Sequence, residues 1–360
     1  MYQETRDWIT ANWDEEITLR EWWARMNEAR LSFPRWPTEW FGRNASQRDQ
    51  SAILKAFSDA DVIGAPTGLG VLMGAPVTMT YGTPEQQKRW MPALATGIEG
   101  WCQLFSEPGA GSDLASASCR AERDGDEWVL NGQKVWTSGA MNSEMGVLLA
   151  RTGEEPRNRG ISMLLIPMKQ PGVEVRPLRQ MTGAAEFNEV FFTNARVPRD
   201  WVIGEVNDGW RAATGLLAHE RSSLGNVGAD TKREASGHAA VPFHYLQALA
   251  ERTGYNTDPL MRQDLARAYT GEKLMGWVAQ RKVFPSVGKL WRTKQSRFVS
   301  ETASRMTLNS ALAQEVDDKD GDFWRYFILN APRMSIGGGT DEIQKNTIGE
   351  RALGLPREPS

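Results

Sequence analysis

Two short segments carry residue types that could hold a large polar cofactor. The first is residues 106–113 (SEPGAGSD) and the second is residues 136–138 (WTS). Gly109 and Gly111 leave parts of the first segment without side chains, so a ligand can approach its backbone closely, and the serine hydroxyls of both segments can bond ring nitrogens or phosphate oxygens. A flavin would suit this combination, although glycine and serine also occur together in ordinary turns.

A third group with possible chemistry is Glu220, which lies in a helical pattern. Ala213 and Leu216 belong to the apolar stripe of this helix, and at about 100° per residue Glu220 falls on the same stripe. A carboxylate that faces the interior without a partner has a raised pKa, which suits a general base. The alternative is a structural ion pair with Arg221 or His219.

A fourth segment, residues 336–344 (IGGGTDEIQ), places three glycines before a final helix. The free N–H groups at such a helix start can bind an anion or an oxyanion, and Thr340 or Asp341 can cap the helix. The same pattern also suits a purely structural turn.

The composition limits the kinds of partner. With 360 residues, 40% of them apolar, and a net charge of −3, we expect a globular protein of two or three packed units without a nucleic-acid partner. No apolar run approaches the roughly 20 residues of a membrane span, and the N-terminus lacks a signal pattern, so a cytoplasmic location is expected. We expect no metal site either, since the cysteines and histidines lack ligand spacing: Cys102, Cys119, His219, His238 and His244.

The periodicity divides the chain into three predicted domains. Residues 1–98 read as helices, residues 99–206 alternate with the period of strands, and residues 207–360 read as helices again. In the first domain, Thr83 followed by Pro84 and Gln86 predicts a capped helix start, and the glycine-rich run 64–74 predicts a bend. The tryptophans of this domain are predicted to fill core or subunit contacts: Trp8, Trp13, Trp22, Trp23, Trp36 and Trp40.

The middle domain should form a small sandwich or barrel. Strands are expected at residues 127–130, 147–150, 163–166 and 190–192. Asn131-Gly132 predicts a type I′ hairpin turn that would bring Trp136 and Ser138 onto the returning strand. In the last domain, a helix capped by Asn207 or Asp208 begins, a loop is expected from 225 to about 240, and a final helix ends near residues 354–356.

The whole arrangement resembles the acyl-CoA dehydrogenase family. The resemblance rests on the order of helical, β and helical domains together with four segments: residues 106–113, residues 136–138, Arg196-Val197-Pro198 and Gly338-Gly339-Thr340. It implies a multidomain α+β fold with an N-terminal helical domain, a middle β-barrel or sandwich and a C-terminal helical bundle.

The resemblance also implies a flavin adenine dinucleotide (FAD) between the β domain and the C-terminal helices. Ser138 would face the reactive ring nitrogen, and Ser112 would lie near the pyrophosphate and the CoA chain. The implied cofactor residues are Gln103, Phe105 and Ser106 along one ring edge, Trp136, Thr137 and Ser138 along the other, and Gly111, Ser112, Arg252, Gln263, Thr340 and Glu342 elsewhere.

In this family a glutamate removes the α-proton of an acyl-CoA thioester while the β-hydrogen leaves as hydride to the flavin, which gives a trans-2-enoyl-CoA. Members like the medium- and short-chain enzymes carry the base where this chain has Gly338. Members like the isovaleryl and long-chain enzymes carry it directly before the helix arginine, where this chain has Glu220 and Arg221. The resemblance therefore implies Glu220 as base, Gly338 N–H and Gly339 at the thioester, and Arg221 steadying the CoA or the base.

Partners follow from the same resemblance. The family's second-subunit cofactor motif is present only as Arg252, Tyr255 and Gln263, and no Gln-x-x-Gly-Gly segment is recognisable between residues 306 and 314. Similar departures occur in actinobacterial steroid side-chain dehydrogenases that pair unlike subunits. The implied assembly is a homodimer, a homotetramer or a heterotetramer with a related subunit, and the implied acceptor is an electron-transferring flavoprotein. A flavin oxidase and a non-catalytic partner subunit remain alternatives.

Overall fold

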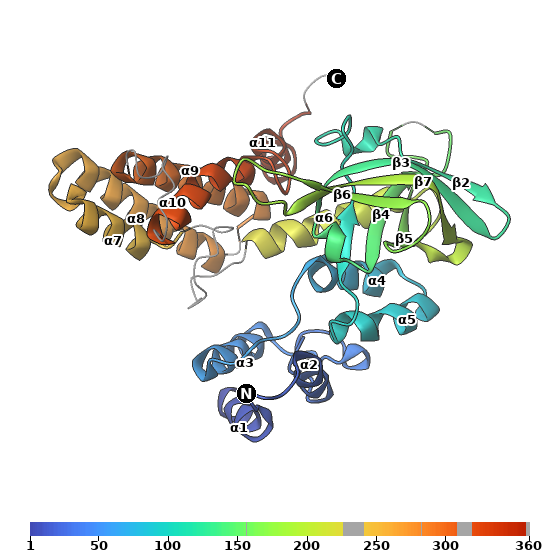
Figure 1. Ribbon diagram of the computed structural model, residues 1–360, viewed down its shortest axis with the longest axis horizontal. Coiled ribbons are helices and arrows are strands. Elements are labelled where there is room, and N and C mark those ends of the chain that lie inside the picture. Colours follow the sequence, from blue (N-terminus) through green and yellow to red (C-terminus); the bar gives the residue numbers. More distant parts are fainter. Residues whose placement is uncertain (156, 226–240, 282, 308–318, 358–360) are drawn as a thin grey trace. The chain divides into compact units, whose positions relative to one another are not determined.

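The structure, a computed structural model, describes all residues except 156, 226–240, 282, 308–318 and 358–360 (Figure 1). It also leaves out the side chains of residues 218–225, 279, 319 and 320. The chain forms two compact units, which are described separately. Unit 1 comprises Met1–Arg179 and Ala185–His219, and unit 2 comprises residues 180–184 and 220–360. The predicted boundaries at residues 98 and 206 stay a prediction.

The N-terminal part of unit 1 is helical, as predicted. Its helices are α1 (Tyr2–Asn12), α2 (Leu19–Glu28), α3 (Gln47–Ala60), α4 (Ala75–Tyr81) and α5 (Pro84–Ala95). The core of α1 to α3 is aromatic: Trp22 is fully buried, stacks on Trp8 at 5.2 Å and meets Trp13 edge-on at 4.9 Å between ring centroids. These tryptophans fill the core, as predicted. The capping box of Thr83 and Gln86 at the start of α5 is also confirmed.

The predicted bend over residues 64–74 is wrong in its second half. Gly70–Gly74 forms a π-helical turn that runs directly into α4. The reason is packing against the sheet, because a Cβ atom on Gly74 would lie 2.7 Å from the Trp101 ring. The glycines of this run therefore allow a helix to approach an indole closely, and they do not mark the end of a helix.

Unit 1 is built around one eight-stranded sheet. The strands are β1 (Trp101–Leu104), β2 (Arg120–Asp124), β3 (Glu127–Ser138), β4 (Met145–Arg151), β5 (Ile161–Pro167), β6 (Val173–Leu178), β7 (Phe187–Pro198) and β8 (Val202–Ile203). Their order is β6-β7-β3-β2-β4-β5-β8, and β1 pairs with β4. The four predicted strands are confirmed within β3, β4, β5 and β7.

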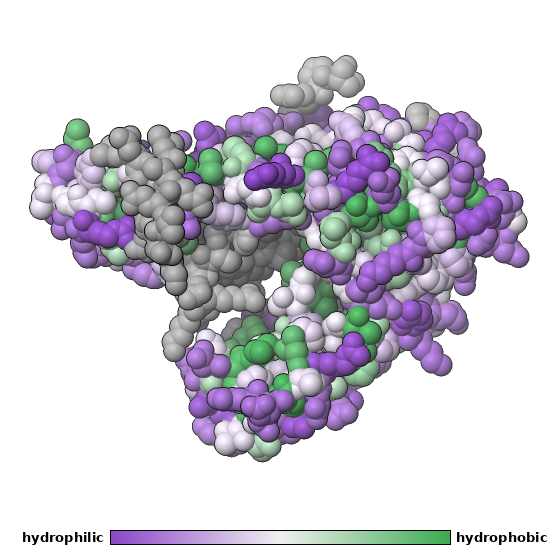
Figure 2. Space-filling view, viewed as in Figure 1, coloured by the Kyte–Doolittle hydropathy of each residue, from purple (hydrophilic) through white to green (hydrophobic). Residues whose placement is uncertain are grey.

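The central strands are buried on both faces. On β4, Val147 and Leu149 pack with the helices α4 and α5, whereas Leu148 and Ala150 pack inside the sheet's other core. Figure 1 shows α4 and α5 beside this part of the sheet. Double burial explains why β4 and β5 read as continuous apolar runs. The outward positions of β2 and β6 are charged, and the visible surface over the sheet is mostly hydrophilic (Figure 2).

The predicted hairpin at Asn131-Gly132 is wrong. Both residues lie inside the continuous strand β3, and the hairpin turn is Gly125-Asp126, with Asp124 paired to Glu127. Asn131 instead serves a bulge in β7: its Oδ1 accepts a hydrogen bond from the N–H of Asn194 at 2.9 Å.

Gly132 has its own reason to be glycine. Its φ is +147°, and a Cβ atom there would lie 2.8 Å from the Cα of Cys119. Asn131 thus bonds the bulge in β7, and Gly132 allows the backbone at Cys119 to approach β3 closely. Both requirements come from segments distant in the sequence.

Helix α6 (Gly209–Gly225) begins directly after the predicted capping residues and buries Ala212, Ala213 and Leu216 in unit 1. The predicted loop over residues 225–240 lies, from 226 onward, outside the described residues.

Unit 2 is a helical bundle. Its helices are α7 (Phe243–Thr253), α8 (Pro259–Gln280), α9 (Pro285–Thr307), α10 (Lys319–Asn330) and α11 (Asp341–Thr347). Helix α9 packs against all four others, and Val299, Trp324 and Phe327 lie in their common core. The final helix continues from α11 through Ile348–Ala352, close to its predicted end. None of the helices in the described ranges is long and apolar enough to cross a membrane.

The close approach at Gly132 can be tested by Gly132→Ala. A methyl group must displace the backbone of Cys119 and also occupy an unfavourable φ, so unit 1 should lose roughly 2 kcal/mol or more of stability. Thermal unfolding followed by tryptophan fluorescence measures the loss. Gly64→Ala is the matched control, because nothing lies within 4 Å of the added Cβ. Equal melting temperatures for the two variants would show that the approach is not constrained.

Candidate functional site

The two predicted cofactor segments lie side by side in unit 1. The N–H of Val135 donates to the carbonyl of Ser106 at 2.9 Å, and the ammonium group of Lys134 donates to the carbonyl of Phe105 at 3.0 Å. The loop before Glu107 is therefore attached to β3 immediately before Trp136. The sequence predicted a hairpin at Asn131-Gly132 that would present Trp136 and Ser138 together; the structure instead carries them on the continuous strand β3.

A buried ion pair joins the same segments. Lys134 Nζ lies 2.7 Å from Glu107 Oε1, and the two side chains are 0% and 5% exposed. The Glu107 carboxylate also accepts from the N–H and hydroxyl of Ser118, at 2.7 and 2.8 Å, and from the N–H of Cys119 at 2.9 Å. Burial raises the pKa of Glu107, but the Lys134 ammonium and these hydrogen bonds outweigh burial and leave the pKa below its ordinary value.

Sequence reasoning did not single out this pair. The sequence could have indicated the burial of Lys134, because Lys134 lies an even number of residues from Trp128 and Leu130 and therefore faces the same buried side of β3, where a charged residue is unexpected. Glu107 offered no such signal, since it lies in a loop and its partner is 27 positions away.

Trp136 and Ser138 form an open face beside this pair. A second bulge, between Lys134 and Thr137, gives Trp136 a positive φ of +60°. Its indole is 60% exposed and meets the ring of Phe187 edge-on. Ser138 is exposed on the same side, whereas Thr137 between them is buried. An exposed indole beside a free hydroxyl offers a planar heteroaromatic ring an aromatic contact and a hydrogen-bond partner.

The loop residues fit the same ligand. Glu107 and Ala110 exchange two backbone hydrogen bonds of 3.0 Å, so Pro108 and Gly109 form a tight turn. Space is open around Gly109 and Gly111, with no atom within 4 Å of an added Cβ. Among the residues that the structure describes, the hydroxyls of the three serines in both segments have no hydrogen-bond partner: Ser106, Ser112 and Ser138. Free hydroxyls on an open loop suit a polar ligand such as FAD.

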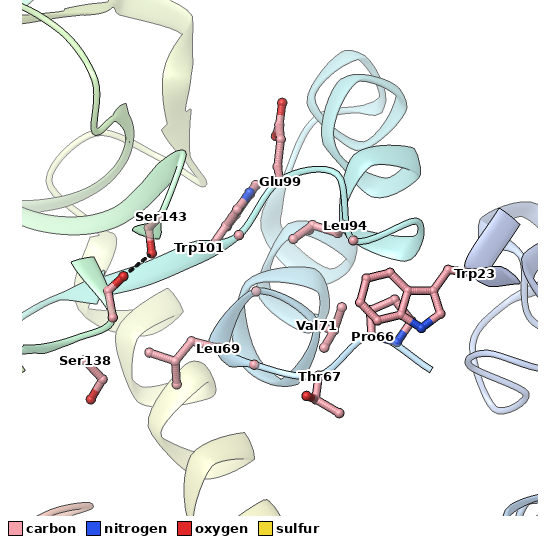
Figure 3. A pocket seen from close by; sticks show the side chains of 15 residues that line it. Trp23, Pro66, Thr67, Leu69, Val71, Leu94, Glu99, Trp101, Ser138 and Ser143 are labelled. Atoms are coloured by element: carbon pink, nitrogen blue, oxygen red, sulfur yellow. Dashed lines mark hydrogen bonds between the residues drawn. The ribbon is translucent and has the colours of Figure 1, made fainter. Parts of the chain in front are cut away.

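A cavity of about 290 Å³ in unit 1 reaches Ser138. Figure 3 shows its apolar side chains, which come from the N-terminal helices, the glycine-rich run and β1, with Ser138 and Ser143 at one end. The Ser143 hydroxyl donates to the carbonyl of Gly139 at 3.0 Å. The apolar lining includes Trp23, Leu69, Val71, Leu94 and Trp101.

The glycine segment before α11 lies in unit 2. Gly338 and Gly339 have φ values of +67° and +86°, which favour glycine, and Thr340 caps α11 by accepting from the N–H of Ile343 at 3.3 Å. The side chain of Gln344 donates to the carbonyl of Gly338 at 2.8 Å. Within the described ranges, the N–H groups of Gly338 and Gly339 make no hydrogen bond, so they are free to donate.

The other predicted residues of unit 2 are more dispersed. Arg252 ends α7 and Gln263 lies in the first turns of α8, and both are exposed. Glu342 is exposed and pairs with Lys345; a hydrogen bond from its own backbone N–H is the main reason that its pKa is lowered. Glu220 and Arg221 lie in helix α6, but their side chains are outside the described part. The predicted site residues therefore form two groups, one in each unit.

Comparison with known proteins gives consistent matches. Residues 3–98 match the family model "Acyl-CoA dehydrogenase, N-terminal domain", and residues 102–195 match "Acyl-CoA dehydrogenase, middle domain". The chain is 41% identical to acyl-CoA dehydrogenase IpdE1 of Mycobacterium tuberculosis, over 94% of this chain and 88% of the relative. It is 38% identical to acyl-CoA dehydrogenase FadE34 of the same organism, over 91% of this chain and 45% of that relative.

Solved structures of similar proteins cover both units. The structure named Tcur3481-Tcur3483 steroid ACAD has a TM-score of 0.78 at 25% identity, over 99% of this chain and 97% of the other. The ChsE4-ChsE5 complex from Mycobacterium tuberculosis has a TM-score of 0.74 at 27% identity, over 99% of this chain and 97% of the other.

The two thiols beneath the loop should be inert. Burial raises the pKa of Cys102 to about 12 and that of Cys119 to about 11. Because the thiolate is the reactive form, folded protein near pH 8 should react with a thiol reagent on the order of 1,000 times more slowly than unfolded protein. Mass spectrometry of the alkylated protein measures both rates. Rapid labelling of either cysteine before unfolding would contradict the burial described here.

Proposed function

The chain belongs to the acyl-CoA dehydrogenase family, and we propose that Glu220 is the base that removes the α-proton of its substrate. Members of the family oxidise acyl-CoA thioesters with FAD, and this chain is an FAD-dependent oxidoreductase of that kind. The observation that carries the assignment of the base is Gly338, a position with a free N–H and no carboxylate. The remaining candidate is Glu220, which precedes Arg221 in helix α6.

We place FAD against the open face of β3. Trp136 and Ser138 would lie along one edge of its ring, and Gln103, Phe105 and Ser106 along the other. Gly111 and Ser112 would lie at the pyrophosphate, and Ser112 also at the CoA chain. This arrangement is supported by the exposed indole and by the free serine hydroxyls. Thr137, between Trp136 and Ser138, is 1% exposed as a whole residue and offers little surface to a ligand. Thr340, Glu342, Arg252 and Gln263 of unit 2 would meet the remaining parts of the cofactor.

Several groups of the chain would take part in removing the α-proton of the substrate. When bound, FAD supplies the acceptor for the β-hydrogen. The Glu220 carboxylate would take the α-proton. An α-C–H bond is too weak an acid unless the developing negative charge on the thioester oxygen is stabilised, and the free N–H of Gly338 is a preorganised donor for that purpose. Gly339 would keep this segment close to the thioester, and Arg221 would steady the base or the CoA.

The acyl group would enter the apolar cavity that reaches Ser138. Its lining by Trp23, Leu69 and Trp101 suits a hydrocarbon group, and its end at Ser138 would bring that group to the reactive edge of the flavin. We propose a steroid-derived acyl group, since the similar Tcur3481-Tcur3483 structure is named a steroid enzyme. A panel of straight, branched and steroid acyl-CoAs, read by anaerobic flavin bleaching, distinguishes the substrates.

For partners we propose an unlike but related subunit and an electron-transferring flavoprotein as acceptor. The ChsE4-ChsE5 and Tcur3481-Tcur3483 structures are complexes of two different chains by name. Arg252 on α7 and Gln263 on α8 are both exposed, which supports contact with a second subunit.

The base can be tested by Glu220→Gln, which keeps the shape of the side chain but cannot take a proton at useful pH. FAD binding should persist, while substrate reduction measured by anaerobic stopped flow should fall by at least about 1,000-fold. Glu251→Gln is the control, because Glu251 is an exposed helix glutamate whose side chain accepts a hydrogen bond from Gln247 and lies outside the proposed site. A lower melting temperature with near-normal reduction would instead identify Glu220 as a member of a structural ion pair.

The assembly can be tested by comparing the chain alone with the chain co-expressed with a related subunit. If the second-subunit cofactor residues are altered, the chain alone should hold clearly less than one FAD per polypeptide, and co-expression should restore binding. Light scattering gives the mass and the visible spectrum gives the flavin content. One FAD per chain in a homo-oligomer would refute the need for an unlike partner.

A further inference from the structure

The pair formed by Glu107 and Lys134 has no role in the reaction described above, yet it lies between the two segments proposed to hold the flavin. Both side chains are almost completely buried, and their charged atoms are 2.7 Å apart. Removing two charges from water is costly, and an uncharged pair of similar volume is often equally stable. Stability by itself therefore does not explain why charges occupy these positions.

The hydrogen bonds around the pair link three segments. Lys134 donates to the carbonyl of Phe105, and the next residue, Val135, donates to the carbonyl of Ser106. Lys134 also pairs with Glu107, so the loop residues 105–107 are all bound to Lys134 or Val135 of β3. The loop therefore has little freedom to slide along the strand or to move away from it.

The carboxylate makes a second attachment on its other side. It accepts two hydrogen bonds from Ser118 and one from the N–H of Cys119, just before β2. Cys119 in turn lies against Gly132 of β3, where only glycine leaves enough space. Glu107 is the residue shared by the loop, the start of β2 and β3.

The residues that this network fixes are the proposed flavin contacts. Ser106 lies between Phe105, whose carbonyl accepts from Lys134, and Glu107, which pairs with Lys134. Trp136 lies two residues after Lys134, within the bulge of β3. We propose that the buried Glu107–Lys134 pair is a positioning device that sets the separation between the two edges of the flavin site. The inference rests on the proposed placement of FAD, and neither residue touches the reacting atoms.

The decisive variant is the double substitution Glu107→Gln and Lys134→Met. It removes both charges and keeps the side-chain volumes close, but it leaves the carbonyl of Phe105 without its donor, so the apoprotein should fold with a moderately lower melting temperature than wild type. The amide oxygen of the new side chain at position 107 can still accept a hydrogen bond from Ser118 or Cys119, but the ion pair with position 134 is lost. We expect the dissociation constant for FAD, measured by fluorescence titration of apoprotein, to rise tenfold or more, with a changed visible spectrum of the bound flavin.

Two further variants complete the test. Glu107→Asp keeps the charge but shortens the side chain, so it should also weaken FAD binding at least tenfold; it decides the question if the double variant does not fold. Glu127→Gln is the matched control, since it breaks an exposed ion pair of the same strand with Arg196 and should change the dissociation constant less than twofold.

The outcomes separate this inference from the function on which it rests. Wild-type protein that takes up no FAD, even with a partner subunit, would refute the flavin site itself. Wild-type protein that binds FAD, together with Glu107 and Lys134 variants that bind it equally well, would refute only the positioning role. A lowered melting temperature without a change in FAD affinity would show that the pair merely stabilises the sheet.

Discussion

The ammonium group of Lys134 is completely enclosed by protein, and its counter-charge, the Glu107 carboxylate, lies 2.7 Å away. Neither charge could be buried without the other, so the loop that carries Glu107 must lie against β3. The same constraint fixes where the loop exposes its serines and where β3 exposes Trp136. The site in unit 1 therefore depends on one electrostatic requirement more than on the chemistry of any exposed residue.

The sheet can support this arrangement because its central strands are buried on both faces. Val147 and Leu149 face the helical side, and Leu148 and Ala150 face the sheet's other core. A shift of register by one residue would move each side chain of β4 to the opposite face, so Val147 and Leu149 would have to fit the core that now holds Leu148 and Ala150. The pairing of β3 with β7 departs from regular register at two bulges, and the one between Lys134 and Thr137 contains Trp136, a proposed flavin contact.

Membership in the acyl-CoA dehydrogenase family explains why the functional residues are divided between two units. The residues that we propose to face the flavin come from a β domain, whose backbone is fixed by pairing. The segment with Gly338 comes from a helical bundle, where two glycines with positive φ precede a capped helix. Gly338 carries no carboxylate, but among the described residues its backbone N–H makes no hydrogen bond, which is why we propose it as the donor to the thioester oxygen.

The sequence by itself determined the features that depend on near neighbours. The helices of both ends, the four strands, the capping box at Thr83, the cap at Thr340 and the start of α6 follow from side chains within a few residues of the backbone that they organise. The segments at residues 106–113 and 136–138 were singled out from their glycines and serines, and their role at a flavin stays a prediction.

Only the tertiary structure decided the features that depend on distant segments. Asn131-Gly132 has the local signature of a hairpin, but its side chain bonds Asn194 and its glycine makes room for Cys119. Gly70–Gly74 has the signature of a bend, but it packs against Trp101 as a helical turn. Lys134 and Glu107 are 27 positions apart, and the residues next to each in the sequence do not indicate that the two side chains form a pair. A short sequence pattern indicates which backbone conformation its residues prefer. Which side chains pack closely, and which buried charges form pairs, depends on the distant segments that the fold places next to them.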